Sequence, residues 1–143
     1  MKKLIKILIV AVLVVNGATA TYSGVNLMIC PDGSSLNLSH HLLDLTPFES
    51  FFIPGLLLFL FNGVSSVSIF VAFYYDDKNT AAVKLQGMMI LCFIIVQVIL
   101  TGVLMPLHIV YGMFGLLIVI CTYVFETTAP RRLSTHGALS NHI

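Results

Sequence analysis

Glu49, His108 and Tyr111 are the residues whose types best suit catalysis in this 143-residue chain. A carboxylate and an imidazole can act as an acid–base pair, and Tyr111 follows His108 by about one helical turn. We expect all three at the outer membrane surface, and they are the candidate catalytic residues. Because the chain offers no complete catalytic constellation, a protein that is not an enzyme is favoured.

His40 and Asp44 also lie about one helical turn apart, next to His41. Together with a distant histidine they could ligate a divalent metal. Groups of this kind are more often solvated or lie among lipid headgroups, so we expect no bound metal. Haem is disfavoured too, because no second transmembrane histidine faces His108. No cofactor is expected.

Three amides, Asn16, Asn62 and Gln97, lie within apolar stretches. Measured from the cytoplasmic ends of the expected spans, each is ~18 Å along its helix, close to the bilayer midplane. Glycine follows both asparagines, which allows close packing. We predict a hydrogen-bonded amide layer in the interior. It would either fix helix register or form a polar pocket that binds a ligand.

The composition places these residues in a membrane protein. Hydrophobic residues make up 58% of the chain and charged residues only 9%, against about 25% charged in a soluble domain. The 7 Lys and Arg nearly balance the 6 Asp and Glu, so no nucleic-acid partner is indicated. We expect membrane lipids as the surroundings.

The apolar stretches predict an all-α, four-helix transmembrane bundle in one domain, residues 1–128, followed by a polar cytoplasmic tail, residues 129–143. The last apolar stretch is about twice as long as one span requires, and Thr101, Gly102 and Pro106 mark the turn that divides it. The expected spans are about 4–28, 47–75, 84–104 and 106–126.

With four spans, every cationic residue falls on one side of the membrane. The positive-inside rule makes that side the cytoplasm. We therefore expect a multi-pass protein of the bacterial inner membrane with both termini cytoplasmic. The residues are Lys2, Lys3, Lys6, Lys78, Lys84, Arg131 and Arg132.

The N-terminus also has the features of a secretory signal peptide: a cationic start, an apolar core and a small-x-small site at 18–20. Cleavage there would leave three spans. We favour a retained first span, because apolar residues resume at 25–29, but both alternatives stay open.

The outer segment, residues 27–53, contains Pro31 and Gly33 near its start, which are residues typical of turns. Leucines at helical spacing (38, 42 and 45) then predict a short interfacial helix between the first two spans. Thr46 and Glu49 form a capping-box pattern that predicts the start of the second span. Pro54 is expected to kink that span.

The runs PDGSSL (31–36) and TPFESFFIPGLLLFLFNG (46–63) resemble a group of small, uncharacterised bacterial membrane proteins. In that group a PDG-type turn precedes a helix start with the pattern tPF-x-x-(F/Y)-x-IPG, and a glutamine such as Gln97 lies in the third span. The resemblance is dense over about a quarter of the chain. It implies a four-span fold and a bacterial origin, and no activity.

Three functions follow as hypotheses. The first is a structural or accessory protein of a membrane complex. The second is a lipid- or quinone-like ligand site, or a membrane enzyme, at the outer leaflet, which requires an outward-open cavity near Glu49 and His108. The third is an oligomeric channel or transporter. Gly55, Gly63 and the Gly112-x-x-Gly115 pattern offer faces for close packing and for a homodimer.

Overall fold

The computed structural model describes residues 1–128, and within them every regular element is helical. Four helical stretches are long and apolar enough to cross a membrane. They are α1 (Lys2–Ile29), the second span (Phe52–Tyr75), α4 (Thr80–Thr101) and α5 (Pro106–Thr127). The four-helix bundle is confirmed, and the chain is a multi-pass membrane protein. The expected tail, with Arg131, Arg132, His136 and His142, lies outside the described residues.

The second span is built from three consecutive segments. An α-helix, α2 (Phe52–Leu57), is followed by a π-helical segment, η3 (Leu58–Val64), and by a second α-helix, α3 (Ser65–Tyr75). A π-helical turn holds more residues than an α-helical turn and often occurs at functional sites. The irregularity lies at the level of Asn62.

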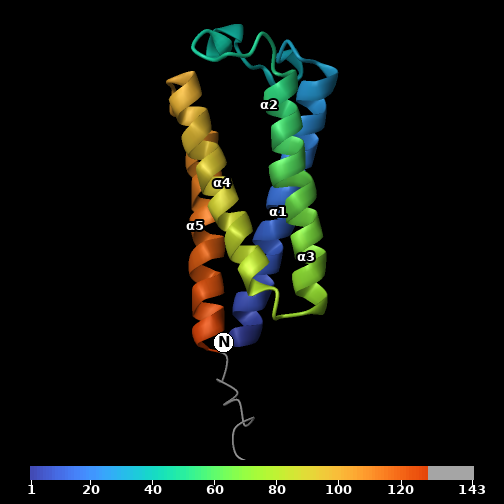
Figure 1. Cartoon of the computed structure of the whole chain (residues 1–143), viewed down its shortest axis with the longest axis vertical. Coiled ribbons are helices and arrows are strands. Elements are labelled where there is room, and N and C mark those ends of the chain that lie inside the picture. The colour runs from blue at the N-terminus through green and yellow to red at the C-terminus, as the bar shows by residue number, and fades with distance from the viewer. Residues whose placement is uncertain (129–143) are drawn as a thin grey trace, which may run out of the picture.

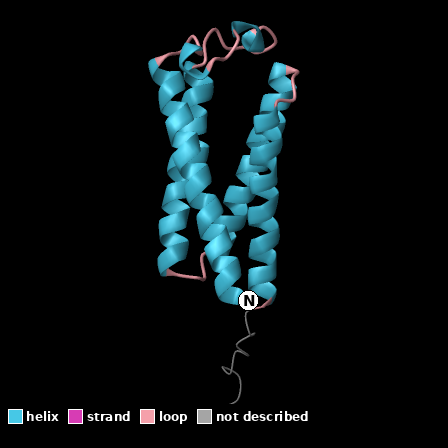
Figure 2. Ribbon diagram, turned by 180° about the vertical axis from the view of Figure 1, so that it is seen from behind, coloured by secondary structure: helices cyan, strands magenta, loops and turns pink. Residues whose placement is uncertain are grey.

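The bundle has two different ends (Figure 1). The terminal end holds Met1, the end of α5 and the turn between α3 and α4. The roof end holds the α4–α5 turn and the roof segment, residues 30–51, which contains two short 3-10 helices, η1 (Ser34–Leu36) and η2 (His40–Leu43). Figure 2 shows the roof segment as mostly loop at one end of the helices.

The start of the second span differs from the prediction. This span begins at Phe52, not at residue 47. Thr46 Oγ1 does accept the Phe48 N–H at 3.3 Å, but Phe51 N–H is bonded to Pro31 O at 2.8 Å, and this tertiary contact delays the helix. Pro54 consequently lies in the first turn, where its missing N–H breaks no helical bond, and the expected cause of a kink is absent.

The turn between α4 and α5 lies where the sequence predicts it. Thr101 ends α4, and Gly102 follows with a left-handed φ of 66° that favours glycine. Pro106 then opens α5 as its first residue. This turn divides the long apolar stretch into two antiparallel helices.

In the terminal half, side chains of all four spans form one buried core. Phe73 and Phe125 meet edge to face with ring centroids 5.5 Å apart. Every residue of the core is at most 8% exposed: Ile9, Val12, Leu13, Phe73, Val83, Ile90, Ile118 and Phe125.

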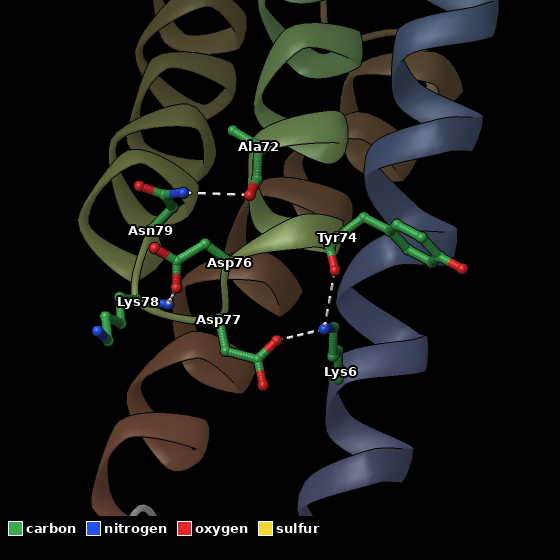
Figure 3. Close-up of polar contacts among 7 residues, drawn as sticks. All are labelled: Lys6, Ala72, Tyr74, Asp76, Asp77, Lys78 and Asn79. Atoms are coloured by element: carbon green, nitrogen blue, oxygen red, sulfur yellow. Dashed lines mark hydrogen bonds and ion pairs between the residues drawn. The ribbon is translucent and has the colours of Figure 1, made fainter.

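Polar contacts connect the helices at the terminal end (Figure 3). Lys6 Nζ of α1 donates to Tyr74 O at 3.1 Å and forms an ion pair with Asp77. Across the bundle, Lys84 of α4 pairs with Glu126 of α5 at 2.9 Å. Apolar packing and ion pairs therefore both hold the helices together at the terminal end.

Glycines bring the helices together within each pair. A Cβ on Gly24 of α1 would lie 2.8 Å from Gly55 O of α2, and a Cβ on Gly115 of α5 would lie 3.0 Å from Gly87 O of α4. Gly112 has no atom within 4 Å of its Cβ position. The close packing predicted for Gly55 and Gly115 is confirmed within this chain, whereas the Cβ position of Gly112 faces open space.

Candidate functional site

The π-helical segment η3 supplies backbone carbonyls to side chains of other helices. Phe61 O accepts a hydrogen bond from Gln86 Nε2 of α4 at 3.2 Å. Asn62 O accepts one from Asn16 Nδ2 of α1 at 3.4 Å. The wide turn displaces these carbonyls from the regular α-helical ladder. It therefore joins three helices through polar contacts inside an apolar bundle.

Asn16 and Asn62 form the polar centre of the bundle. Their side chains are only 1% and 4% exposed. Asn16 Nδ2 also donates to Ser66 Oγ at 2.8 Å. Because the Asn62 backbone oxygen can only accept, it fixes which atom of the Asn16 amide is the nitrogen.

Both asparagine Oδ1 atoms are enclosed and accept no hydrogen bond from any residue within 1–128. An unmade hydrogen bond at a buried acceptor costs about 1–3 kcal/mol. Two such atoms side by side are unusual, since buried polar groups are nearly always paired. Asn16 and Asn62 are in contact, but Asn16 bonds the backbone of Asn62 and not its amide, so among the described residues the predicted layer of bonded amides does not form.

A cavity of about 380 Å³ lies between these asparagines and the roof segment. Its walls come from all four spans, which separate into α1 with α2 and α4 with α5 toward the roof end (Figures 1 and 2). Asn16 and Asn62 line it at the end nearer the bundle centre, which we call the floor. Apolar side chains form most of the walls, including Leu27, Leu57, Leu58, Phe93, Ile94, Leu100 and Leu107.

The roof segment covers the cavity with apolar side chains. Leu43 and Phe51 are buried against Leu27 of α1. The other roof residues that line the cavity are Leu36, Leu38, Leu42, Thr46 and Phe48. The sequence predicted one short interfacial helix that carries Leu38, Leu42 and Leu45. The structure has two shorter 3-10 helices joined by loops instead, and Leu45 is 73% exposed.

Local bonds hold the start of the roof segment. Gly33 has a φ of 80°, and a Cβ there would lie 2.8 Å from the Phe51 ring. The Asp32 carboxylate accepts from Ser34 Oγ at 2.8 Å and from Ser34 N at 3.1 Å. These hydrogen bonds stabilise the charged carboxylate and lower the pKa of Asp32.

The candidate catalytic residues are not brought together. His108 and Tyr111 line the cavity, whereas Glu49 is exposed and does not line it. His108 Nδ1 accepts the N–H of Met105 at 3.2 Å. In the neutral ring the proton is therefore on Nε2, which makes that atom a donor. Within residues 1–128, the structure therefore places no carboxylate beside His108 in the cavity wall.

The candidate metal residues also separate. His41, not His40, pairs with Asp44, at 3.1 Å, and both side chains are exposed. The His40 ring instead lies 6.3 Å from the Phe51 ring. Within residues 1–128 no group of three or more His, Cys, Asp or Glu side chains gathers.

Gln97 lines the cavity but lies nearer the roof end than the two asparagines. The third span starts at Thr80, four residues before the predicted 84, so Gln97 is about 25 Å from the start of the helix at 1.5 Å per residue. Gln86 is the fully buried glutamine, and it bonds Ser65 Oγ at 2.8 Å. The sequence analysis missed Gln86 because the expected span placed it at the membrane edge.

No protein-family model, curated protein or solved structure matches this chain.

Proposed function

We propose that this protein binds a hydrophobic small molecule in the cavity beneath the roof segment, and that it does so in the bacterial inner membrane with the roof end outside. Five cations support this orientation because they all lie at or near the terminal end, and the positive-inside rule makes that end cytoplasmic. They are Lys2, Lys3, Lys6, Lys78 and Lys84.

The observation that carries the binding function is the cavity itself. Its volume of about 380 Å³ falls within the ~300–1,000 Å³ of small-molecule sites. Most of the side chains around it are apolar, so a hydrophobic molecule bound there makes dispersion contacts with the wall.

The arrangement of the helices supports an entry route from the membrane. α2 packs against α1 and, within the described residues, contacts neither α4 nor α5. We propose that a ligand dissolved in the outer leaflet enters the cavity between α2 and α4. A structural or accessory role is the competing proposal, and ligand occupancy separates the two.

A tryptophan reporter tests binding, because the chain contains no Trp. Phe93 lines the cavity, so a Phe93→Trp variant in lipid nanodiscs places a fluorophore there. Titration with 12-bromododecan-1-ol, whose bromine quenches indole, should give saturable quenching. Quenching that rises in proportion to the probe in the lipid would reflect partitioning alone and would overturn the proposal.

Two matched substitutions control the test in the same reporter background. Ser23 lines the cavity, so Ser23→Phe should fill it and remove saturable quenching. Ser68 is exposed on the outside of α3, so Ser68→Phe adds the same group toward lipid and should leave quenching unchanged. Equal effects of the two substitutions would contradict a site in the cavity.

A further inference from the structure

The polarity of the cavity runs opposite to that of the outer leaflet. Its floor, nearest the bilayer centre, carries the two asparagines with unused oxygens. Its roof, nearest the water in the proposed orientation, consists largely of leucine and phenylalanine side chains. A lipid in its ordinary orientation would place its headgroup against leucines and its tail end against amides.

The lack of charged residues in the cavity wall further limits which ligands can bind there. Among residues 1–128, no Asp, Glu, Lys or Arg lines the cavity. An ionised carboxylate or phosphate would lose its hydration there without gaining a counter-charge, which costs far more than burying a neutral polar group. The ligand must therefore be neutral.

The other polar wall residues are less suited to hold the polar group. The Thr101 hydroxyl already donates to Gln97 O at 2.9 Å. His108 Nδ1 accepts from Met105, and its Nε2 donor lies in the first turn of α5, at the roof end. Ser23 and Gln97 line the middle of the cavity, between floor and roof. Only the floor combines nearly complete burial with unpaired acceptors.

Of the two floor residues, Asn62 has the side chain that can change its orientation when a ligand binds. Its Oδ1 is enclosed in the structure, so a ligand reaches it only after the amide turns. The Asn16 amide is held by Ser66, whereas the Asn62 side chain makes no hydrogen bond to any described residue. The turned amide presents an oxygen that accepts and a nitrogen that donates, so a hydroxyl can bond to either atom and an N–H group to the oxygen.

We propose that the ligand is a neutral, single-chain amphiphile with a hydroxyl or N–H group, bound with this polar end at Asn62 and its apolar end beneath the roof. This proposal rests on the proposed function, and it adds the chemical class and the orientation of the ligand. The cavity volume favours one chain over a two-chain lipid.

The orientation of the bound ligand is tested with two alcohols of equal chain length that carry bromine at opposite ends. Phe48 lies in the roof and Phe93 about 12 Å along α4 from its roof end. With 12-bromododecan-1-ol, saturable quenching should be at least twofold stronger in a Phe48→Trp variant than in Phe93→Trp. With 2-bromododecan-1-ol, the order should reverse. The opposite pattern for both probes would show the headgroup at the roof and overturn the proposal.

The chemistry is tested with 1-bromododecane, 12-bromododecan-1-ol and 12-bromododecanoate in the Phe93→Trp background. The alcohol should bind about five- to tenfold more tightly than the alkane, the value of one net hydrogen bond of about 1 kcal/mol. The carboxylate should bind most weakly. Asn62→Leu should reduce alcohol binding to the alkane level, and Asn62→Ser, which keeps an acceptor, should restore part of it.

Binding of 1-bromododecane also reports folding. It should be equal in Asn62→Leu and the parent, because the alkane uses only apolar contacts. If no probe binds saturably to the parent, the proposed function fails. If the alkane and the alcohol bind equally, or the carboxylate binds best, the function stands and the polar-end proposal fails.

Discussion

The two halves of the bundle are built from the same four spans, yet one is packed and the other holds a cavity. No single span accounts for the difference by its hydropathy, since the four spans have nearly equal mean values of 2.1 to 2.2. In the terminal half, large side chains such as Phe73 and Phe125 fill the space between all four helices. In the roof half, Gly24 and Gly55 draw α1 and α2 together, while this pair separates from α4 and α5 (Figures 1 and 2). The interior therefore opens where large side chains no longer fill the space between the two helix pairs.

The largest effect is expected from removing part of α1. Cleavage after Ala20 would remove Ile9, Leu13 and Asn16, each at most 1% exposed, and with them the terminal core. We therefore predict that the protein retains its first 20 residues in the membrane, as measured by intact mass, and that a chain lacking residues 2–20 fails to accumulate.

A cleavage-site variant controls this prediction. Ala18 is exposed on the outside of α1, so Ala18→Leu alters the small-x-small site without touching the core. The variant should differ from the wild type only by the substitution mass. A mature wild-type chain that is shorter by the first 20 residues would show that the terminal core does not form in the cell.

Substitution of two phenylalanines compares the packing of the two halves most directly. Phe73 is fully buried in the terminal core, whereas Phe93 borders the cavity. An unfolded span keeps its side chains in lipid, so Phe73→Ala loses mainly the cavity term, about 2–3 kcal/mol. Phe93→Ala should cost about 1 kcal/mol or less in reversible unfolding from mixed micelles. Equal costs would show that the two halves are packed alike.

Glycine substitutions test how each helix pair is held together. A Cβ on Gly24 would lie 2.8 Å from both Gly55 O and Phe59 N. These are backbone atoms that cannot turn aside, so Gly24→Ala should destabilise the protein by about 1–3 kcal/mol. Gly112→Ala, with nothing within 4 Å, should change the free energy of unfolding by less than about 0.5 kcal/mol. A neutral Gly24→Ala would contradict the close crossing of α1 and α2.

The sequence predicts the spans well because burial in lipid requires continuous apolar helices. The turn at Gly102 and Pro106 and the meeting of Asn16 with Asn62 follow from local chemistry and helix length. The cavity does not, because it depends on how far two helix pairs separate. The start of the second span also depends on a tertiary bond, from Phe51 to Pro31, which no local pattern encodes.

The smallest effect concerns the ion pair that joins α1 to the α3–α4 turn. Lys6 and Asp77 are partly exposed, at 27% and 45%, so solvent screens their attraction, and we expect a coupling of about 0.5 kcal/mol. A double-mutant cycle of Lys6→Met and Asp77→Asn measures it by reversible unfolding. The same cycle should leave quenching in the Phe93→Trp reporter unchanged, because the cavity lies in the opposite half. If these substitutions altered ligand binding, the ion pair at the terminal end would control how far the helix pairs separate in the roof half. The two halves would then be structurally coupled.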